Sequence, residues 1–586
     1  MDTESFKPGA PKVSQTPPPE DRLDTWGEIA TYLKVDQRTA QRWEETAKLP
    51  VNRLQGRVYA YRSELDAWIR KREPLPPSWI EKLKAVMTRY GERRLVIIAL
   101  ALVVAAAAYG LWRSWPLPPP PHRVMLAVLP FENLSGDPQQ EFFSNGLTEE
   151  MITELGRLGP GSVIAYSSVM AYKGTHKRVD EIGRELNVNY VLEGSVERGG
   201  DLVRIVAHLV QVKDQAPLWA DSYDRPIENV LALQREVADA VVSQISEKLA
   251  TPGTGAATSA PRAHPVDPKA FDAYLRGRYE WNMRSPLGIK NAISDFEQAI
   301  RQDPNYAPPY AGLADTYALL GSVPNDALPP REAIPKAKAA AEKALALDKS
   351  LAEAHASLAY IDFAYEWDRE GAEREFAQAL QINPGYATAH EWKALYLVAM
   401  GRADEAEAEV EKAQQLDPLS NIMNMAAAQV YLYAGKYDRA IDLSEAALKR
   451  DPNFFLAYYF RGRAYEQKGM LSEALADFQK GSALSNGSPI MMMALGHAQG
   501  VSGNKEEARK LLDGLAKLAN QKYVPAVYMV GIAAGLGDKD QAFHWLDQAV
   551  QDRCDYVVYL AYEPGLDNLR ADPRFAGLTR RIGLGR

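Results

Sequence analysis

Four polar side chains with the chemistry to read nucleic acid recur at helical spacing near the N-terminus. They are Gln37, Arg38, Gln41 and Arg42, in the segment QRTAQRWEE. Positions three and four apart share one face of an α-helix, so these side chains are expected to project together. Arg and Gln contact base edges in the major groove of DNA, and Arg also reaches phosphates. We therefore predict that this helix reads duplex DNA.

Two helices joined by a short turn are needed to present that face. Thr25 can cap a first helix, TWGEIATYL, and Asp36 can cap the second, which carries the four polar residues. The predicted apolar side of the pair consists of Ile29, Ala30, Leu33, Val35, Ala40 and Trp43. This pattern buries one side of each helix and leaves the Gln/Arg side in solvent.

A strand and a third helix are predicted after the pair. RVYAYR follows a turn at Gln55-Gly56 and is typical of a strand in a wing, and Ser63 can cap the next helix. The residues of that helix expected to face the core are Leu65, Trp68 and Ile69. The cations placed to meet the DNA backbone are Arg53, Arg57 and Arg62.

The helix pair IATYLKVDQRTAQRW and the tail VYAYRSELDAWI resemble the winged helix-turn-helix of the MerR/excisionase family, over residues 23–73. The resemblance implies DNA recognition. The local charge agrees with it, since residues 34–72 hold 10 basic and 5 acidic side chains. The alternative is a winged helix that binds protein and whose basic face is only solvated.

Residues 95–112, LVIIALALVVAAAAYGLW, form an eighteen-residue run without a charge. A helix of this length spans roughly 27 Å, just enough for the hydrocarbon core of a membrane. The run starts too far into the chain, and is too long, for a secretory signal. We predict a transmembrane helix. The alternative, a buried core helix, is disfavoured because so long a run without a polar face is rare in soluble folds.

The flanking charges predict the orientation of that span. Only Arg113 follows it closely, whereas its N-terminal side carries Lys82, Lys84, Arg89, Arg93 and Arg94. Positive charge stays in the cytoplasm, so the N-terminus is expected inside and the C-terminus outside. Residues 1–94 carry a net charge of +4 and the remainder −12. The basic N-terminal part suits a polyanionic partner in the cytoplasm, and the acidic remainder does not. The expected location is the inner membrane, with a periplasmic C-terminal part.

Residues 122–250 alternate strand-like and helix-like stretches. Strands are predicted at 124–131 and 162–167, with a hairpin about Gly199-Gly200 and a final amphipathic helix. The segments VLPFENLSGDPQQEFFSNGLTEEMI, YVLEGSV and LWADSYDR resemble the amino-terminal domain of TolB-type periplasmic proteins, which also occurs in regulators and adenylate cyclase fusions. The resemblance implies an α/β fold and no particular ligand. The following segment, TPGTGAATSAPRAHP, predicts a flexible linker.

Small residues recur every 34 positions in the C-terminal half, at Ala372, Ala406, Ala440, Ala474, Ala508 and Ala542. That is the tetratricopeptide (TPR) period, in which a small residue sits where two helices cross. Helix-stopping prolines follow at Pro384, Pro418 and Pro452. The resemblance to TPR proteins implies a superhelix whose groove binds a peptide or protein surface. The alternative is a spacer without a specific ligand.

No catalytic signature is found in the sequence. It contains no HExxH, no paired CxxC, no phosphate-binding GxxxxGK[ST] loop and no GxSxG elbow, and Cys554 is its only cysteine. We expect a non-enzyme without a metal or cofactor.

The predicted fold class is multidomain: a small winged helix-turn-helix, a single transmembrane helix, an α/β TolB-N-like domain and an all-α TPR superhelix. The predicted segments are 1–22 disordered, 23–73 winged helix-turn-helix, 78–94 juxtamembrane helix, 95–112 transmembrane helix, 122–250 TolB-like domain, 251–265 linker, 266–556 TPR repeats (about eight) and 557–586 C-terminal cap.

The predicted function is a membrane-bound, DNA-binding transcription regulator that senses an envelope partner. Its layout is similar to that of ToxR-type regulators, although the winged helix is of another family. The expected partners are duplex DNA, the membrane, a protein or peptide in the TPR groove and a second copy of the chain as a homodimer. The alternative is an envelope protein-interaction scaffold with no direct role at DNA.

Overall fold

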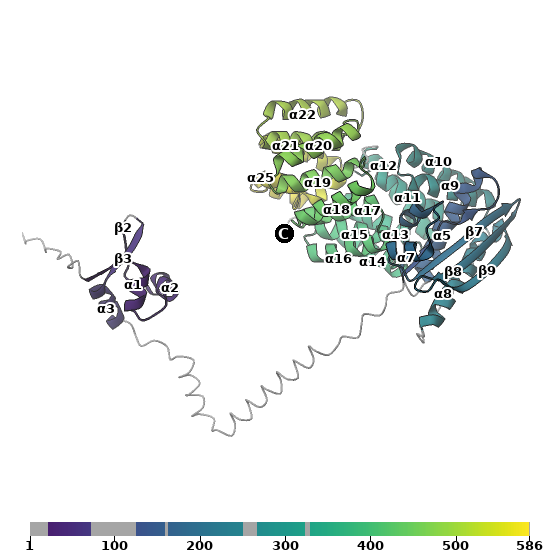
Figure 1. The fold of residues 1–586 in the computed structure, drawn as a ribbon. Helices are drawn as coiled ribbons and strands as arrows, with labels where there is room; N and C mark the ends of the chain where they lie inside the picture. The colour runs from purple at the N-terminus through teal and green to yellow at the C-terminus, as the bar shows by residue number, and fades with distance from the viewer. Residues whose placement is uncertain are drawn as a thin grey trace, which may run out of the picture. The chain divides into compact units, whose positions relative to one another are not determined.

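The structure is a computed structural model that describes residues 21–54, 56–71, 125–158, 162–249, 266–322 and 328–584. They form two compact units, within Met1–Pro120 and Pro121–Arg586 (Figure 1). The predicted juxtamembrane helix at 78–94, the predicted span at 95–112 and the predicted linker at 251–265 lie outside the described residues. No helix among the described residues is long and apolar enough to cross a membrane.

The N-terminal unit is a helix pair followed by a hairpin and a third helix. Its elements are β1 (Arg22–Leu23), α1 (Trp26–Tyr32), α2 (Gln37–Ala47), β2 (Asn52–Leu54), β3 (Arg57–Tyr61) and α3 (Arg62–Lys71). Thr25 and Asp36 cap the first two helices as predicted, accepting from the backbone N–H groups of Glu28 at 3.2 Å and Thr39 at 3.0 Å. Between the helices, Lys34 adopts the left-handed conformation, which turns the chain.

The third helix differs from the prediction at two residues. It begins at Arg62, and the Ser63 hydroxyl donates to Asp21 at 2.5 Å instead of capping its own helix. Ile69 was expected in the core but is 46% exposed. Trp68 covers that side of the helix pair, with its ring 5.8 Å from the Trp43 ring and its indole N–H donating to the Ala47 carbonyl.

An α/β layer opens the second unit. Its sheet has the strand order β6-β4-β7-β8-β9, with β5 beside β7. β4 runs parallel to β6 and β7, while β7, β8 and β9 form an antiparallel meander. The strands are β4 (Met125–Val128), β5 (Glu132–Asn133), β6 (Ser162–Val163), β7 (Tyr190–Gly199), β8 (Leu202–Gln211) and β9 (Ala216–Pro226). The helices are α5 (Glu141–Leu158), α6 (Tyr166–Val169), α7 (Val179–Glu185) and α8 (Val230–Leu249).

Alternation along β4 explains why both faces of this sheet are covered. Leu126 and Val128 point into a core shared with α5 and α8, while Ala127 belongs to a second cluster with α6 and α7. The predicted strand at 162–167 ends early, at Val163. The next residues pack against the repeats instead, since the Ala165 N–H donates to the Leu416 carbonyl at 2.7 Å.

Eight consecutive helical pairs follow within the described residues from Pro268 to Gln551 (Figure 1). The pairs are α9 (Pro268–Asn282) with α10 (Pro286–Gln302), α11 (Pro308–Leu320) with α12 (Pro330–Leu347), α13 (Ala352–Ile361) with α14 (Arg369–Ile382), α15 (Ala387–Ala399) with α16 (Ala403–Leu416), α17 (Asn421–Tyr433) with α18 (Tyr437–Arg450), α19 (Phe455–Gln467) with α20 (Leu471–Leu484), α21 (Pro489–Val501) with α22 (Lys505–Ala519), and α23 (Ala526–Leu536) with α24 (Lys539–Gln551).

The period-34 alanines lie where the sequence predicted. All six are fully buried, each in the second helix of its pair. Close approach of the two helices is also visible at Gly462, where an added Cβ would lie 2.5 Å from the Phe478 ring. Small residues at these crossings therefore set the packing of the pairs.

The α/β layer and the repeats share one apolar core. Phe143 of α5 meets Phe271 of α9 edge to face at 6.2 Å, and Gly146 lies so close to Leu275 that a Cβ would come within 2.7 Å. At a second contact, the Ser168 hydroxyl donates to Asp417 at 2.6 Å. The sequence predicted a middle domain separated by a flexible linker, whereas these contacts join the two parts into one body.

Candidate functional site

The four polar residues predicted to read DNA lie together on the outer side of α2. Gln37, Arg38, Gln41 and Arg42 are all exposed, whereas Ala40 on the opposite side is fully buried. Within the described part of the N-terminal unit, Arg38 and Arg42 form no ion pair. The helix therefore offers two cations and two amides to a partner outside the unit.

The three predicted backbone cations are exposed but differ in their surroundings. Arg53 pairs with Glu44 of α2 at 2.9 Å, which partly neutralises it, and Arg62 lies 5.7 Å over the Tyr32 ring. Arg57, at the start of β3, forms no ion pair among the described residues. Of the predicted cations, only Arg53 is neutralised by an ion pair among the described residues.

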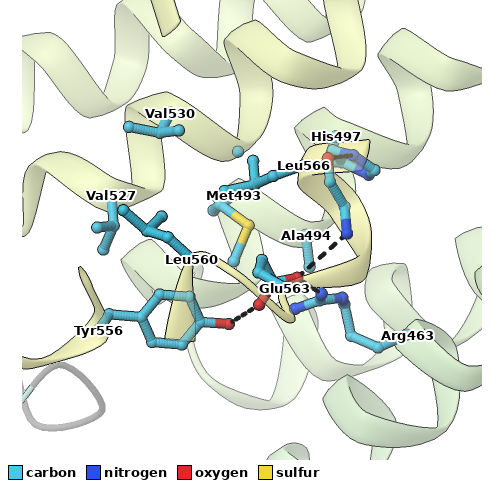
Figure 2. Close-up of a pocket in the computed structure, with 12 residues that line it drawn as sticks. Arg463, Met493, Ala494, His497, Val527, Val530, Tyr556, Leu560, Glu563 and Leu566 are labelled. Carbon is cyan, nitrogen blue, oxygen red and sulfur yellow. Dashed lines mark hydrogen bonds and ion pairs between the residues drawn. The ribbon is translucent and has the colours of Figure 1, made fainter. Parts of the chain in front are cut away.

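A second candidate site is the inner face of the repeats, formed here by α17, α19, α21 and α23. The sequence predicted an open groove there and a cap at 557–586. In the structure, residues 553–570, which we call the C-terminal segment, lie against this face, while α26 (Pro573–Arg581) packs beside α24. Figure 2 shows Tyr556, Leu560 and Leu566 of the segment among residues of α21 and α23. A cavity of about 30 Å³ is left, room for only one or two water molecules.

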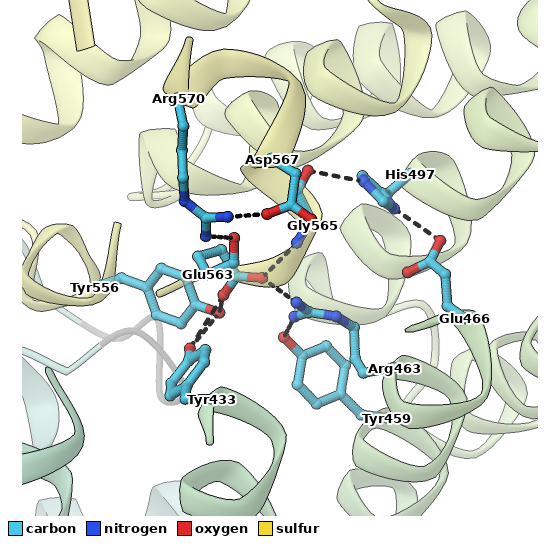
Figure 3. A network of polar contacts seen from close by, with 10 residues as sticks. All are labelled: Tyr433, Tyr459, Arg463, Glu466, His497, Tyr556, Glu563, Gly565, Asp567 and Arg570. Carbon is cyan, nitrogen blue, oxygen red and sulfur yellow. Dashed lines mark hydrogen bonds and ion pairs between the residues drawn. The ribbon is translucent and has the colours of Figure 1, made fainter. Parts of the chain in front are cut away.

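A buried ion pair anchors the C-terminal segment. Glu563 pairs with Arg463 of α19, and their side chains are only 5% and 6% exposed (Figure 3). The second carboxylate oxygen of Glu563 lies 3.1 Å from the Tyr433 hydroxyl and 2.5 Å from that of Tyr556. The Gly565 N–H donates to the first oxygen at 3.2 Å. Both oxygens are thus bonded, which makes the burial of this charge tolerable.

The electrostatics match this geometry. Burial alone would raise the pKa of Glu563, but Arg463 and the hydrogen bonds hold the pKa below its ordinary value. His497 of α21 lies between Glu466, at 2.8 Å, and the Gly565 carbonyl, at 3.2 Å. Burial opposes its charged form, yet the Glu466 carboxylate raises the pKa of His497 above the ordinary value. The network is built to hold the segment in place.

Further contacts extend the C-terminal segment to earlier repeats. The Tyr360 hydroxyl of α13 donates to Asp555 at 2.9 Å, and the Arg553 guanidinium lies 4.5 Å over the Trp367 ring. The 34-residue period could not predict these contacts, because it relates neighbouring repeats, whereas Tyr360 and Asp555 are 195 residues apart. Glu563 belongs to no repeated spacing that would mark it as a binding residue. The only signal in the sequence is that a Glu and several aromatic residues follow the last repeat.

Part of the chain is recognised by its similarity to known proteins. Residues 367–421 and 425–489 match the tetratricopeptide repeat family. The C-terminal part of the chain is an all-α TPR superhelix. It provides a protein-interaction scaffold of the TPR type, and an α/β region precedes it.

Two curated proteins are similar over parts of the chain. A Rhizobium meliloti (strain 1021) protein that carries an adenylate cyclase name is 37% identical over 199 residues, covering 34% of this chain and 33% of that protein. The transcriptional regulator HilA of Salmonella typhimurium is 25% identical over 334 residues, covering 56% of this chain and 57% of HilA. The chain therefore spans between a third and somewhat over half of these curated relatives.

Among solved structures, human IFIT1, as a dimer with m7Gppp-AAAA, is 16% identical with a TM-score of 0.37. The match covers 55% of this chain and 78% of the IFIT1 chain. Such a score adds nothing beyond the helical repeats already seen.

Proposed function

We propose that this chain is a DNA-binding transcription regulator attached to the inner membrane, whose α/β layer and repeats sense a protein partner on the outer side. The observation that carries the proposal is the outer side of α2, where Arg38 and Arg42 are exposed without ion pairs beside Gln37 and Gln41. Two exposed cations beside two exposed amides on one side of a helix fit a polyanionic partner, whose phosphates and base edges accept hydrogen bonds. The 25% identity over 334 residues with HilA, which is named a transcriptional regulator, supports a role in transcription.

The membrane attachment rests on the sequence of residues 95–112 and its flanking charges. Because the helix pair lies before this run, an N-in topology would keep it beside the chromosome. The TolB-like segment at 122–250 and the TPR repeats would then form a protein-binding body on the other side. A reporter that is active only outside the cytoplasm should therefore be active when fused after Val266 and silent when fused after Arg72.

The direct test is duplex binding by the full chain in detergent micelles, measured by fluorescence anisotropy at several salt concentrations. Affinity should fall steeply with salt, because phosphate contacts release counterions. The double variant Arg38→Ala, Arg42→Ala should lose about 1–3 kcal/mol for each base contact removed. The matched control is Arg70→Ala, Lys71→Ala, which removes the same charge from exposed positions on α3. Equal losses in both variants would assign the effect to net charge alone.

The second candidate function is an envelope scaffold without a role at DNA, which the TPR match favours. It predicts that the wild-type chain does not retain duplex DNA, including its own promoter, at any salt concentration. It also predicts that the Arg38→Ala, Arg42→Ala variant keeps all its protein partners in a crosslinking experiment. Retention of DNA by the wild type would exclude it.

A further inference from the structure

A large cleft lies where the α/β layer meets the first repeats. Its volume is about 630 Å³, within the range of about 300–1,000 Å³ that small-molecule sites occupy. One wall comes from α5 and α8, and the other from the turns at 303–307 and 347–351. Tyr274 and Arg278 of α9 complete the lining. Unlike the inner face of the repeats, this space is not filled by another part of the described chain.

The lining has a surplus of acidic groups. Two of its cations are already neutralised, because Arg278 pairs with Glu149 and Arg157 lies 3.5 Å from Glu154. The remaining acids of the lining are Glu150, Asp303, Asp348 and Glu353. Only one other cation, Arg235, lines the cleft. An added positive charge would therefore be attracted, and an added negative charge repelled.

Glu150 is the acid best placed to meet a ligand. One of its carboxylate oxygens accepts from the Tyr274 hydroxyl at 2.6 Å, which fixes the side chain. Neither Glu150 nor Glu353 forms an ion pair among the described residues. The Tyr274 ring lies beside the Tyr306 ring at 5.4 Å, and aromatic faces of this kind attract organic cations.

Two polar groups of the lining also lack partners. The amide nitrogen of Gln234 and the hydroxyl of Tyr306 are buried without a hydrogen bond among the described residues, in side chains 4% and 6% exposed. Such groups cost free energy unless something satisfies them. An oxygen atom that accepts from Gln234 would remove one of these penalties.

We propose that this cleft binds a small organic ammonium compound, with its ammonium group against Glu150 and Glu353 and its carbon skeleton against Tyr274 and Tyr306. A ligand that also carries a hydroxyl or carbonyl oxygen would satisfy Gln234. The proposal goes beyond DNA binding and does not depend on it. Because the cleft is formed by both parts of the second unit, an occupant would contact α5 and α8 on one side and the first repeats on the other.

The electrostatics of Glu150 support this geometry. Burial raises its pKa to about 7, and the charges of Glu149 and Glu353 add to the rise, while Tyr274 and Arg278 oppose it. An ammonium group beside it would lower that pKa again, so binding near neutral pH should release a proton.

The test measures the thermal unfolding midpoint of the full chain with three probes of one shape: benzylamine, benzyl alcohol and benzoate, each at millimolar concentration. Benzylamine should raise the midpoint, since a ligand of the folded state stabilises it by mass action. The neutral and anionic probes should not. An equal rise with benzoate or benzyl alcohol, or no rise with benzylamine, would overturn the proposal.

Variants assign the effect to the cleft. Glu150→Gln removes the charge but keeps an acceptor for Tyr274, and should weaken benzylamine binding about tenfold or more, measured by calorimetric titration. Glu473→Gln is the matched control on the exposed side of α20 and should bind as the wild type does. Should Glu150→Gln fail to fold, Glu353→Gln supplies the same test. The proposal would also be overturned if Glu150→Gln and Glu353→Gln both folded and both bound benzylamine as tightly as the wild type.

Discussion

The outer side of α2 and the inner face of the repeats use charged residues in opposite ways. Arg38 and Arg42 are exposed and form no ion pair among the described residues. Arg463 is 6% exposed and pairs with Glu563, which comes from the chain's own C-terminal segment. The predicted reading surface is therefore available to a partner, whereas this part of the TPR groove is already occupied by the C-terminal segment.

This contrast changes where a protein partner is expected. TPR repeats indicate protein or peptide partners, and an inner groove is the usual site. Here the groove at α17–α23 leaves only about 30 Å³. A protein partner of the second unit would then use another surface of the repeats or of the α/β layer.

The largest expected effect comes from breaking the buried pair. Arg463→Ala leaves Glu563 buried without its cation, and should cost about 3–5 kcal/mol of stability. The loss should be visible in urea unfolding of the full chain, and limited proteolysis should show new cuts within 553–570. DNA binding per folded molecule should not change.

A compensating change sharpens that result. In Arg463→Met with Glu563→Gln, both charges are removed while an amide oxygen remains to accept from Tyr433 and Tyr556, and much of the lost stability should return. If the double variant is no more stable than Arg463→Ala, the ion pair is not what anchors the segment.

A smaller effect is expected at Glu150, which forms no ion pair among the described residues. Its pKa of about 7 lies above the ordinary value of 4.5, so the folded state prefers the protonated form. Wild-type stability should therefore fall as pH rises from about 4.5 to about 7, where the unfolded chain ionises first. Glu150→Gln should remove the part of that fall that Glu150 causes, with a gain on the order of 1–3 kcal/mol at pH 8 and none at pH 4.

The measurement is a pair of urea titrations at each pH. Glu563 is stabilised in its charged form, whereas Glu150 is expected to be stabilised in its neutral form. Equal destabilisation by Glu150→Gln at both pH values would contradict this difference, since it would indicate a lost contact and not a suppressed ionisation. Glu149, Arg278, Tyr274 and Glu353 face Glu150 and are unchanged in this variant.

A still smaller effect, on DNA binding, is expected for Arg57 of the N-terminal unit. It is exposed at the start of β3, and we expect it to contact a phosphate. Arg57→Ala should weaken DNA binding uniformly across sequences and reduce the slope of log affinity against log salt by about 1. A sequence-dependent loss would assign Arg57 to base contacts instead.

The smallest effect is expected for an exposed ion pair in the repeats. Lys510 lies 3.3 Å from Glu507, and both side chains are more than half exposed. Lys510→Ala should change stability by less than about 1 kcal/mol and leave DNA binding unchanged. A larger change would show that exposed ion pairs of the repeats contribute to stability on the scale expected for the buried Arg463–Glu563 pair.

Local signals in the sequence predicted much of the fold. The caps at Thr25 and Asp36 and the buried alanines such as Ala440 follow from helix chemistry and from the 34-residue period. These features depend on neighbours in the chain or in the repeat. A pattern within a short window is enough to reveal them.

Contacts between distant segments were not predictable in the same way. The sequence predicted a separate middle domain and an open groove, and the structure shows α5 packed on α9 and the C-terminal segment in the groove. Neither Phe143 nor Glu563 belongs to a periodic pattern from which its contact residue could be predicted. The cleft around Glu150 escaped prediction for the same reason, since its residues come from several separate parts of the chain.

The most direct test of the regulator proposal is recovery of crosslinked DNA from cells that make the full chain at native level. The wild-type chain should enrich a small number of promoter segments, and Arg38→Ala, Arg42→Ala should lose that enrichment while remaining as abundant as the wild type. Arg70→Ala, Lys71→Ala should keep it. Recovery of no specific segment by the wild type, or the same segments by the Arg38→Ala, Arg42→Ala variant, would contradict the proposal that the outer side of α2 reads DNA.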